Sequence, residues 1–146
     1  MTTVYDAAAR RNLHTRIDAL TPGAQPRWGK MNVGQMVVHC DMHLRHSLGE
    51  HLTPADKPIR FFPLNLLIIY VLPTPKGVPT MDELRSPASG VFEDDRRRLK
   101  DSLEKLGALP RGTRMPVHAA FGRIGHHVHG KLEHDHLDHH LKQFGV

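Results

Sequence analysis

Seven prolines fall between positions 50 and 90, and they constrain the fold of this chain more than any other feature. Proline lacks a backbone N–H and clashes with the preceding helical turn, so this stretch cannot form an extended regular helix except near 64–71. A connection of this length is unusual between neighbouring antiparallel helices. It predicts a crossover, in which the helices before and after it run in the same direction.

Four further segments of the chain carry apolar residues at helical spacing. They span about 4–20, 32–49, 89–106 and 125–144. The second has a marked start, because Asn32 is followed three residues later by Gln35 in a capping-box pattern. No series of strands is indicated. The 146 residues suit one domain, so we expect a single all-α four-helix bundle over residues 1–146.

The composition excludes several classes of protein. With 39% hydrophobic and 24% charged residues, the chain matches a folded globular protein and not a disordered, collagen-like or coiled-coil one. The net charge of +5 is dispersed, apart from Arg96, Arg97 and Arg98, and no nucleic-acid motif accompanies it. We therefore expect no nucleic-acid partner.

The apolar run at 61–72 is too short for a membrane span, which needs about 20 apolar residues, so it predicts a buried core segment. Cys40 is the only cysteine, which excludes an intramolecular disulfide and a cysteine-based zinc finger. The N-terminal residues lack the apolar region of a signal peptide. These features together predict a cytoplasmic protein with no membrane partner.

Histidine is the unusual residue type, with 13 in the chain and seven between positions 126 and 140. His136 and His140 are four residues apart and fall inside the apolar arc of the last predicted helix, whereas His134 points outwards. Two imidazoles at this spacing can reach one cation. The alternative is that both are core histidines bonded to backbone or water.

A metal site needs at least a third ligand, and the second predicted helix offers His39, His43 and His46. His39 and His43 are again four residues apart on one side of the helix, with His43 nearer the centre of its apolar stripe. Cys40 is a further candidate, although a cysteine in an apolar stripe is more often a small buried hydrophobe. Spacing alone leaves the third ligand undetermined.

Four sequence blocks resemble a known family: RWGKMNVGQMVVHC (27–40), LPTPKGVPT (72–80), HAAFG (118–122) and HDHLDHHLKQFGV (134–146). They are similar to a small bacterial branch, of unassigned function, of the DinB/YfiT-like metalloenzyme superfamily. The resemblance implies a four-helix bundle with a long crossover and a metal held by His39, His136 and His140. Relatives transfer low-molecular-weight thiols or isomerise thiol adducts, and many are dimers. The commoner HPxFG motif is HAAFG here.

These patterns lead us to expect a metal-dependent enzyme of thiol-transferase or hydrolase type. Three histidines leave coordination positions open on a divalent ion of zinc, nickel or iron, the layout of a catalytic site. A small-molecule substrate, with a low-molecular-weight thiol as one candidate, and a homodimer are the expected partners. Glu133 is a candidate for orienting an imidazole or carrying a proton. The alternative is a non-catalytic protein whose tract at 126–140 buffers or senses metal ions.

Overall fold

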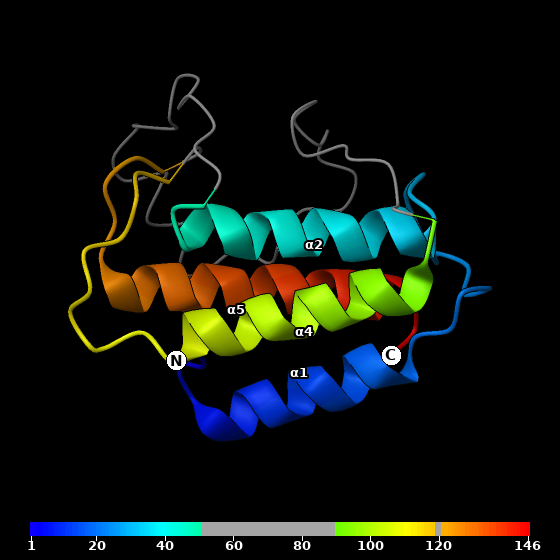
Figure 1. Ribbon diagram of the computed structural model, residues 1–146, viewed down its shortest axis with the longest axis horizontal. Helices are drawn as coiled ribbons and strands as arrows, with labels where there is room; N and C mark the ends of the chain where they lie inside the picture. The colour runs from blue at the N-terminus through cyan, green and yellow to red at the C-terminus, as the bar shows by residue number, and fades with distance from the viewer. Residues whose placement is uncertain (51–89, 119–120) are drawn as a thin grey trace.

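The protein is described by a computed structural model that covers residues 1–50, 90–118 and 121–146 (Figure 1). These residues form four helices: α1 (Ala7–Ala19), α2 (Val33–Ser47), α4 (Phe92–Gly107) and α5 (His126–Gln143). No strand occurs within the described ranges, where an isolated bridge joins His118 to Gly122. The predicted all-α four-helix bundle is confirmed.

The directions of the helices agree with the predicted crossover. Figure 1 shows α2 and α4 running one way along the bundle, and α1 and α5 running the opposite way. The helices on either side of the proline-rich connection are therefore parallel. The connection at 51–89, with the apolar run at 61–72, lies outside the described residues.

Helix α2 begins where the sequence predicts. The Asn32 side chain accepts a hydrogen bond from the Gln35 backbone N–H at 2.9 Å, and the Gln35 side chain accepts one from the Asn32 backbone N–H at 3.0 Å. This reciprocal pair satisfies two N–H groups that the first turn would otherwise leave without partners. Since it fixes the first turn, it also fixes which side of α2 carries His39, about two turns later.

The core is built mainly from aliphatic side chains of all four helices. The most deeply buried are Leu13, Ile17, Met36, Val37, Leu44, Leu99, Leu103, Leu106, Leu137 and Leu141. The first half of α5 differs from the predicted apolar arc. There Val128 and Leu132 are half-buried, whereas His129 and Glu133 are 0% and 2% exposed. The first half of α5 therefore buries polar groups, and its second half buries Leu137 and Leu141 together with His140 and Gln143.

A glycine allows the N-terminal segment to cross this polar end of α5. The Val4 backbone N–H donates to the Gly130 carbonyl at 3.0 Å, and a Cβ at Gly130 would overlap the Tyr5 ring. The Tyr5 ring also stacks on His126, with ring centroids 3.8 Å apart. The N-terminal residues thus help to cover the polar half of the helix.

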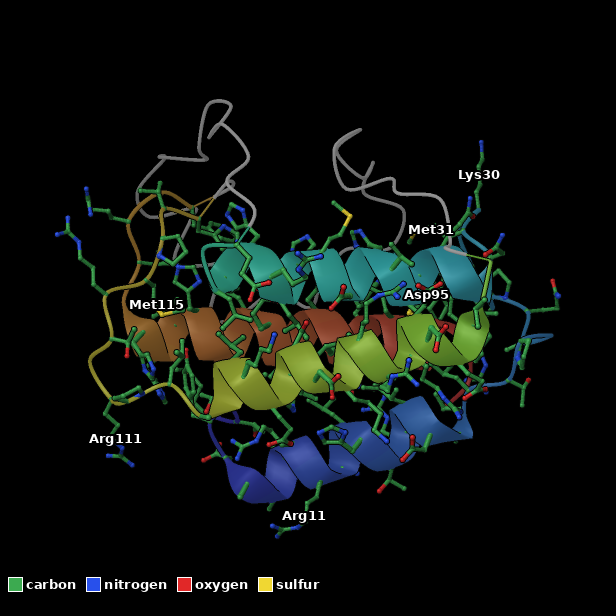
Figure 2. All side chains as sticks on the ribbon, viewed as in Figure 1. Arg11, Lys30, Met31, Asp95, Arg111 and Met115 are labelled. Carbon is green, nitrogen blue, oxygen red and sulfur yellow. The ribbon has the colours of Figure 1, made fainter. Side chains whose placement is uncertain are left out.

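The outer surface carries basic groups in several places. Figure 2 shows Arg11, Lys30 and Arg111 projecting from separate parts of the molecule. This distribution agrees with the dispersed charge of the sequence. Among the helices of the described ranges, none combines the length and apolar content needed to cross a membrane.

Candidate metal centre

Three histidines that the sequence singles out meet between α2 and α5. The Nε2 atom of His136 lies 3.0 Å from Nε2 of His39 and 3.2 Å from Nε2 of His140. The three pairs of ring centroids are 4.9, 4.6 and 4.9 Å apart, with ring planes inclined by 69° to 88°. The three rings are therefore steeply inclined to one another, and His136 Nε2 faces the Nε2 atoms of both His39 and His140.

Hydrogen bonding alone cannot satisfy this arrangement. Each imidazole nitrogen offers either one proton or one lone pair. His136 Nε2 can make one good hydrogen bond, yet it faces the Nε2 atoms of both His39 and His140 at hydrogen-bond distance. At most one of these two contacts can therefore be a good hydrogen bond, whereas one metal ion could accept a lone pair from each nitrogen.

A divalent cation fits the spacing of His136 Nε2 from each of the other two nitrogens. Bonds from zinc to imidazole nitrogen are about 2.0–2.1 Å, so nitrogens 3.0 and 3.2 Å apart would subtend angles of about 90–105° at such an ion. These angles lie between the octahedral and tetrahedral values. The geometry is therefore compatible with zinc, nickel or iron and does not select among them.

The surroundings of the histidines favour neutral rings. Burial lowers the pKa of His136 well below its ordinary value, and His43, His140 and His39 lower it further. Burial likewise lowers the pKa of His140 to about 4, with His139 and His43 acting in the same direction. Neutral imidazoles keep a lone pair for a metal at pH 7.

His43, the residue that spacing could not separate from His39, lies in the same cluster. Its ring centroid is 4.0 Å from that of His136 and 5.1 Å from that of His39. One ligand atom from each of His39, His43 and His136 lies within 4.8 Å of the others. The His43 ring is tilted by only 35° from His136, so it packs against that ring instead of standing across it.

Cys40 forms a second candidate set with His136 and His140, again with ligand atoms within 4.8 Å of one another. A thiol must lose its proton to bind a metal. Burial raises the pKa of the Cys40 thiol well above its ordinary value, and the charges of Glu133 and Asp41 raise it further. These conditions agree with the interpretation of Cys40 as a small buried hydrophobe.

Glu133 is a buried carboxylate beside the histidine cluster. It accepts a hydrogen bond from the Ser47 hydroxyl at 2.7 Å, and its Oε1 lies 3.9 Å from His43 Nδ1. Burial alone would raise its pKa, but His43, Ser47 and His118 outweigh this and hold the pKa of Glu133 at about 2. Its Oε2 atom has no hydrogen-bond partner among the described residues. Glu133 is thus a charged group deep in the bundle, oriented by α2.

Sequence reasoning did not assign roles to Ser47, His129 or Gln143. His129 Nε2 donates to the Pro116 carbonyl at 3.1 Å, and its Nδ1 lies 3.4 Å from the Ser47 hydroxyl. Its spacing of four residues from Glu133 was a visible signal that the two share a face of α5. Ser47 gave no such signal, because its contacts cross between helices.

Other residues of the histidine tract face away from the centre. His134 Nδ1 contacts Asp135 at 3.2 Å, and the Asp138 carboxylate pairs with Arg16 at 2.8 Å. His139 lies at the margin, with its ring edge-on to Trp28 at 5.6 Å and near His140 at 5.2 Å. The tract is therefore not one chelating surface, since neighbouring histidines serve different contacts.

Comparisons with protein-family models, with curated proteins and with solved structures gave no match to this chain. The resemblance of its motifs to the DinB/YfiT-like superfamily therefore stays a prediction. The function has to be argued from the geometry of the histidine cluster.

Proposed function

We propose that this protein binds one divalent metal ion through Nε2 of His39, His136 and His140 and acts as a metal-dependent enzyme of thiol-transferase or hydrolase type. The observation that carries the proposal is the approach of two further imidazole nitrogens, from His39 and His140, to the single Nε2 of His136. This ligand set is supported over the sets with His43 or Cys40 because the His43 ring packs against His136 and because burial raises the pKa of the Cys40 thiol.

The bound ion would be zinc, nickel or iron, and it would supply Lewis acidity that favours ionisation of a water or a thiol. Three protein ligands leave room for a small molecule beside them. The nearby negative charge of Glu133 would complement the charge of a divalent ion, because in the described part of the chain its ion-pair partner is a histidine and not a lysine or arginine.

His43 and Glu133 are the groups placed to handle a proton at this site. With its Nδ1 towards the Glu133 carboxylate, His43 would keep a proton on that atom and turn Nε2 towards the side where His136 lies. A carboxylate behind an imidazole orients the ring. The proposed substrate is a low-molecular-weight thiol, which is the class that the motif resemblance suggests.

Metal stoichiometry tests the binding half of this proposal. The full chain, purified without a histidine tag and dialysed against nickel or zinc, should retain one ion per chain by plasma mass spectrometry. His39→Ala, His136→Ala and His140→Ala should each abolish this tight binding, whereas His134→Ala, on the same helix as His136, should keep it. Gradual loss of several weakly held ions across all four variants would instead support a non-catalytic metal buffer.

Cobalt substitution tests whether a small molecule reaches the ion. Addition of 2-mercaptoethanol to the cobalt-loaded protein should produce a sulfur-to-cobalt charge-transfer band, because three histidines leave a coordination position open. His134→Ala should give the same band. A cobalt spectrum that does not respond to thiol would contradict the thiol-transferase assignment.

A further inference from the structure

Gln143, the last residue of α5, joins the candidate metal centre to the loop between α1 and α2. It is 3% exposed and lies three residues after His140. Its side-chain Nε2 donates to the Trp28 carbonyl at 2.6 Å, and its Oε1 lies 2.8 Å from His140 Nδ1. Its own backbone carbonyl accepts a hydrogen bond from the Arg27 N–H at 2.7 Å. One buried side chain thus connects two elements far apart in sequence.

These contacts fix where the proton of His140 sits. A carbonyl oxygen only accepts, so the Gln143 atom that faces Trp28 must be the amide nitrogen and the atom that faces His140 must be the oxygen. The oxygen also only accepts, so His140 Nδ1 carries the proton. A neutral imidazole has one proton, and His140 Nε2 is therefore the bare nitrogen that faces His136.

Gly29 keeps the loop close enough for this chain of contacts. Its φ angle is +81°, and a Cβ at this position would lie 2.6 Å from Gln143 Nε2. A side chain there would displace either the loop or the amide. Two adjacent residues of the loop therefore pack against Gln143: Trp28 provides the hydrogen-bond acceptor, and Gly29 leaves space for the amide.

We propose that Gln143 is a positioning residue that holds His140 in the tautomer able to bind a metal, and that the loop at 27–29 holds Gln143. The inference rests on the proposed metal site. It adds that Gln143, which is not a metal ligand, influences the metal affinity of that site. Partners of this kind, which orient a ligating imidazole, typically change metal affinity by about 10- to 100-fold when removed.

Two substitutions of Gln143 separate the hydrogen bond from simple packing. Gln143→Met keeps the length of the side chain but removes the acceptor, and it should weaken nickel binding by about 10- to 100-fold in a chelator competition. Gln143→Glu keeps an acceptor for His140 but loses the donor to the Trp28 carbonyl, so its nickel affinity should lie between those of Gln143→Met and the parent protein. Lys142→Met, at an exposed neighbouring position, is the control and should bind as the parent does.

The tautomer itself is a readout that a packing defect would not produce. In the metal-free full chain, two-bond proton–nitrogen correlations should show His140 protonated at Nδ1 in the parent and in Gln143→Glu, and a mixture of tautomers in Gln143→Met. Parent-like tautomer and nickel affinity in Gln143→Met would overturn the proposal. If the parent protein bound no nickel, the proposed function would fail, whereas the tautomer would still test the role of Gln143.

Gly29→Ala breaks the same connection from the loop side. Gly112→Ala is its matched control, because Gly112 has a φ of +82° and a Cβ added there would meet no atom within 4 Å, so both variants carry similar backbone strain. Gly29→Ala should lose nickel affinity in the range of Gln143→Met and show the same mixed His140 tautomers. Gly112→Ala should change neither. Equal nickel affinities in the two glycine variants would contradict a role for the loop.

Discussion

Helix α2 takes part in two buried serine–carboxylate pairs, one on each side, and they behave in opposite ways. Towards α4, the Ser102 hydroxyl donates to Asp41 at 2.6 Å, and towards α5, the Ser47 hydroxyl donates to Glu133 at 2.7 Å. Burial raises the pKa of Asp41 in spite of its bond to Ser102, whereas the pKa of Glu133 is held at about 2. The hydrogen bond is the same, so the surroundings cause the difference.

Histidines near Glu133 cause the difference between the pKa values of the two carboxylates. Leu99 and Leu103 are buried on the α4 side, where Arg45 and Arg98 lower the pKa of Asp41 by less than burial raises it. On the α5 side, His43 and His118 lie close enough to Glu133 to stabilise its charge. The α2–α4 interface is thus complete by itself, while the α2–α5 interface leaves nitrogen and oxygen atoms without partners among the described residues. We infer that the first interface stabilises the bundle and that the second binds a ligand.

The largest expected effect comes from damage to the aliphatic interface. Leu103 is 0% exposed, and Leu103→Ala should lower the free energy of unfolding by about 2–5 kcal/mol, through lost burial and the cavity left behind. Urea denaturation of the metal-free protein measures this loss. Val91→Ala, at a position that is 53% exposed, is the control and should change stability by less than about 0.5 kcal/mol. Equal losses for the two variants would contradict this division of the bundle.

The histidine interface should make the metal-free protein sensitive to acid. Because burial lowers the pKa of His140 from 6.5 to about 4, the unfolded chain binds its proton first as pH falls. Stability from this group is complete above about pH 6.5 and is lost progressively towards pH 4, by at most about 3 kcal/mol. Urea denaturation between pH 7 and pH 4 should show a shallower pH dependence for His140→Ala. An unchanged slope would contradict a buried neutral His140.

Metal binding should stabilise the folded chain only through the interface between α2 and α5. With free nickel at 100 times its dissociation constant, the parent protein should gain about 2.7 kcal/mol. His136→Ala should gain nothing, His134→Ala should gain as much as the parent, and His139→Ala should lose at most part of the gain. His43→Ala should still gain, since His43 packs against His136 and is not a proposed ligand. Thermal unfolding with and without nickel would measure these gains, and a parent-like gain in His136→Ala would contradict the ligand set.

The smallest expected effect compares the two serines directly. Ser47→Ala and Ser102→Ala each remove a buried hydrogen bond to a carboxylate and should each cost about 1.5–3 kcal/mol of stability. Only Ser47→Ala should also weaken nickel binding, by a few-fold, because only Glu133 lies beside the histidines. Chelator competition on both variants makes the test. Equal nickel affinities would show that Glu133 does not act on the site.

Much of this architecture could be predicted from the sequence, because its signals are local. Apolar residues at helical spacing predict four helices, and the pair Asn32 and Gln35 marks a helix start through contacts within one turn. His136 and His140 share a helix, so their spacing alone predicts that their side chains can meet.

The rest depends on how helices are rotated against one another. Spacing places His39 and His43 on the same side of α2. Only the position of α5 decides that His39 Nε2 faces His136 and that the His43 ring packs against His136. Ser47 and Gln143 act across 86 and 115 residues of sequence, on Glu133 and the Trp28 carbonyl respectively. No local pattern encodes such contacts.

The most direct test of the central claim is anomalous diffraction at the nickel edge from crystals of the nickel-loaded full chain. The account predicts a single peak between α2 and α5, about 2.0–2.1 Å from Nε2 of His39, His136 and His140. The absence of an anomalous peak at that point, or several partial peaks along the histidines of residues 126–140, would contradict the account.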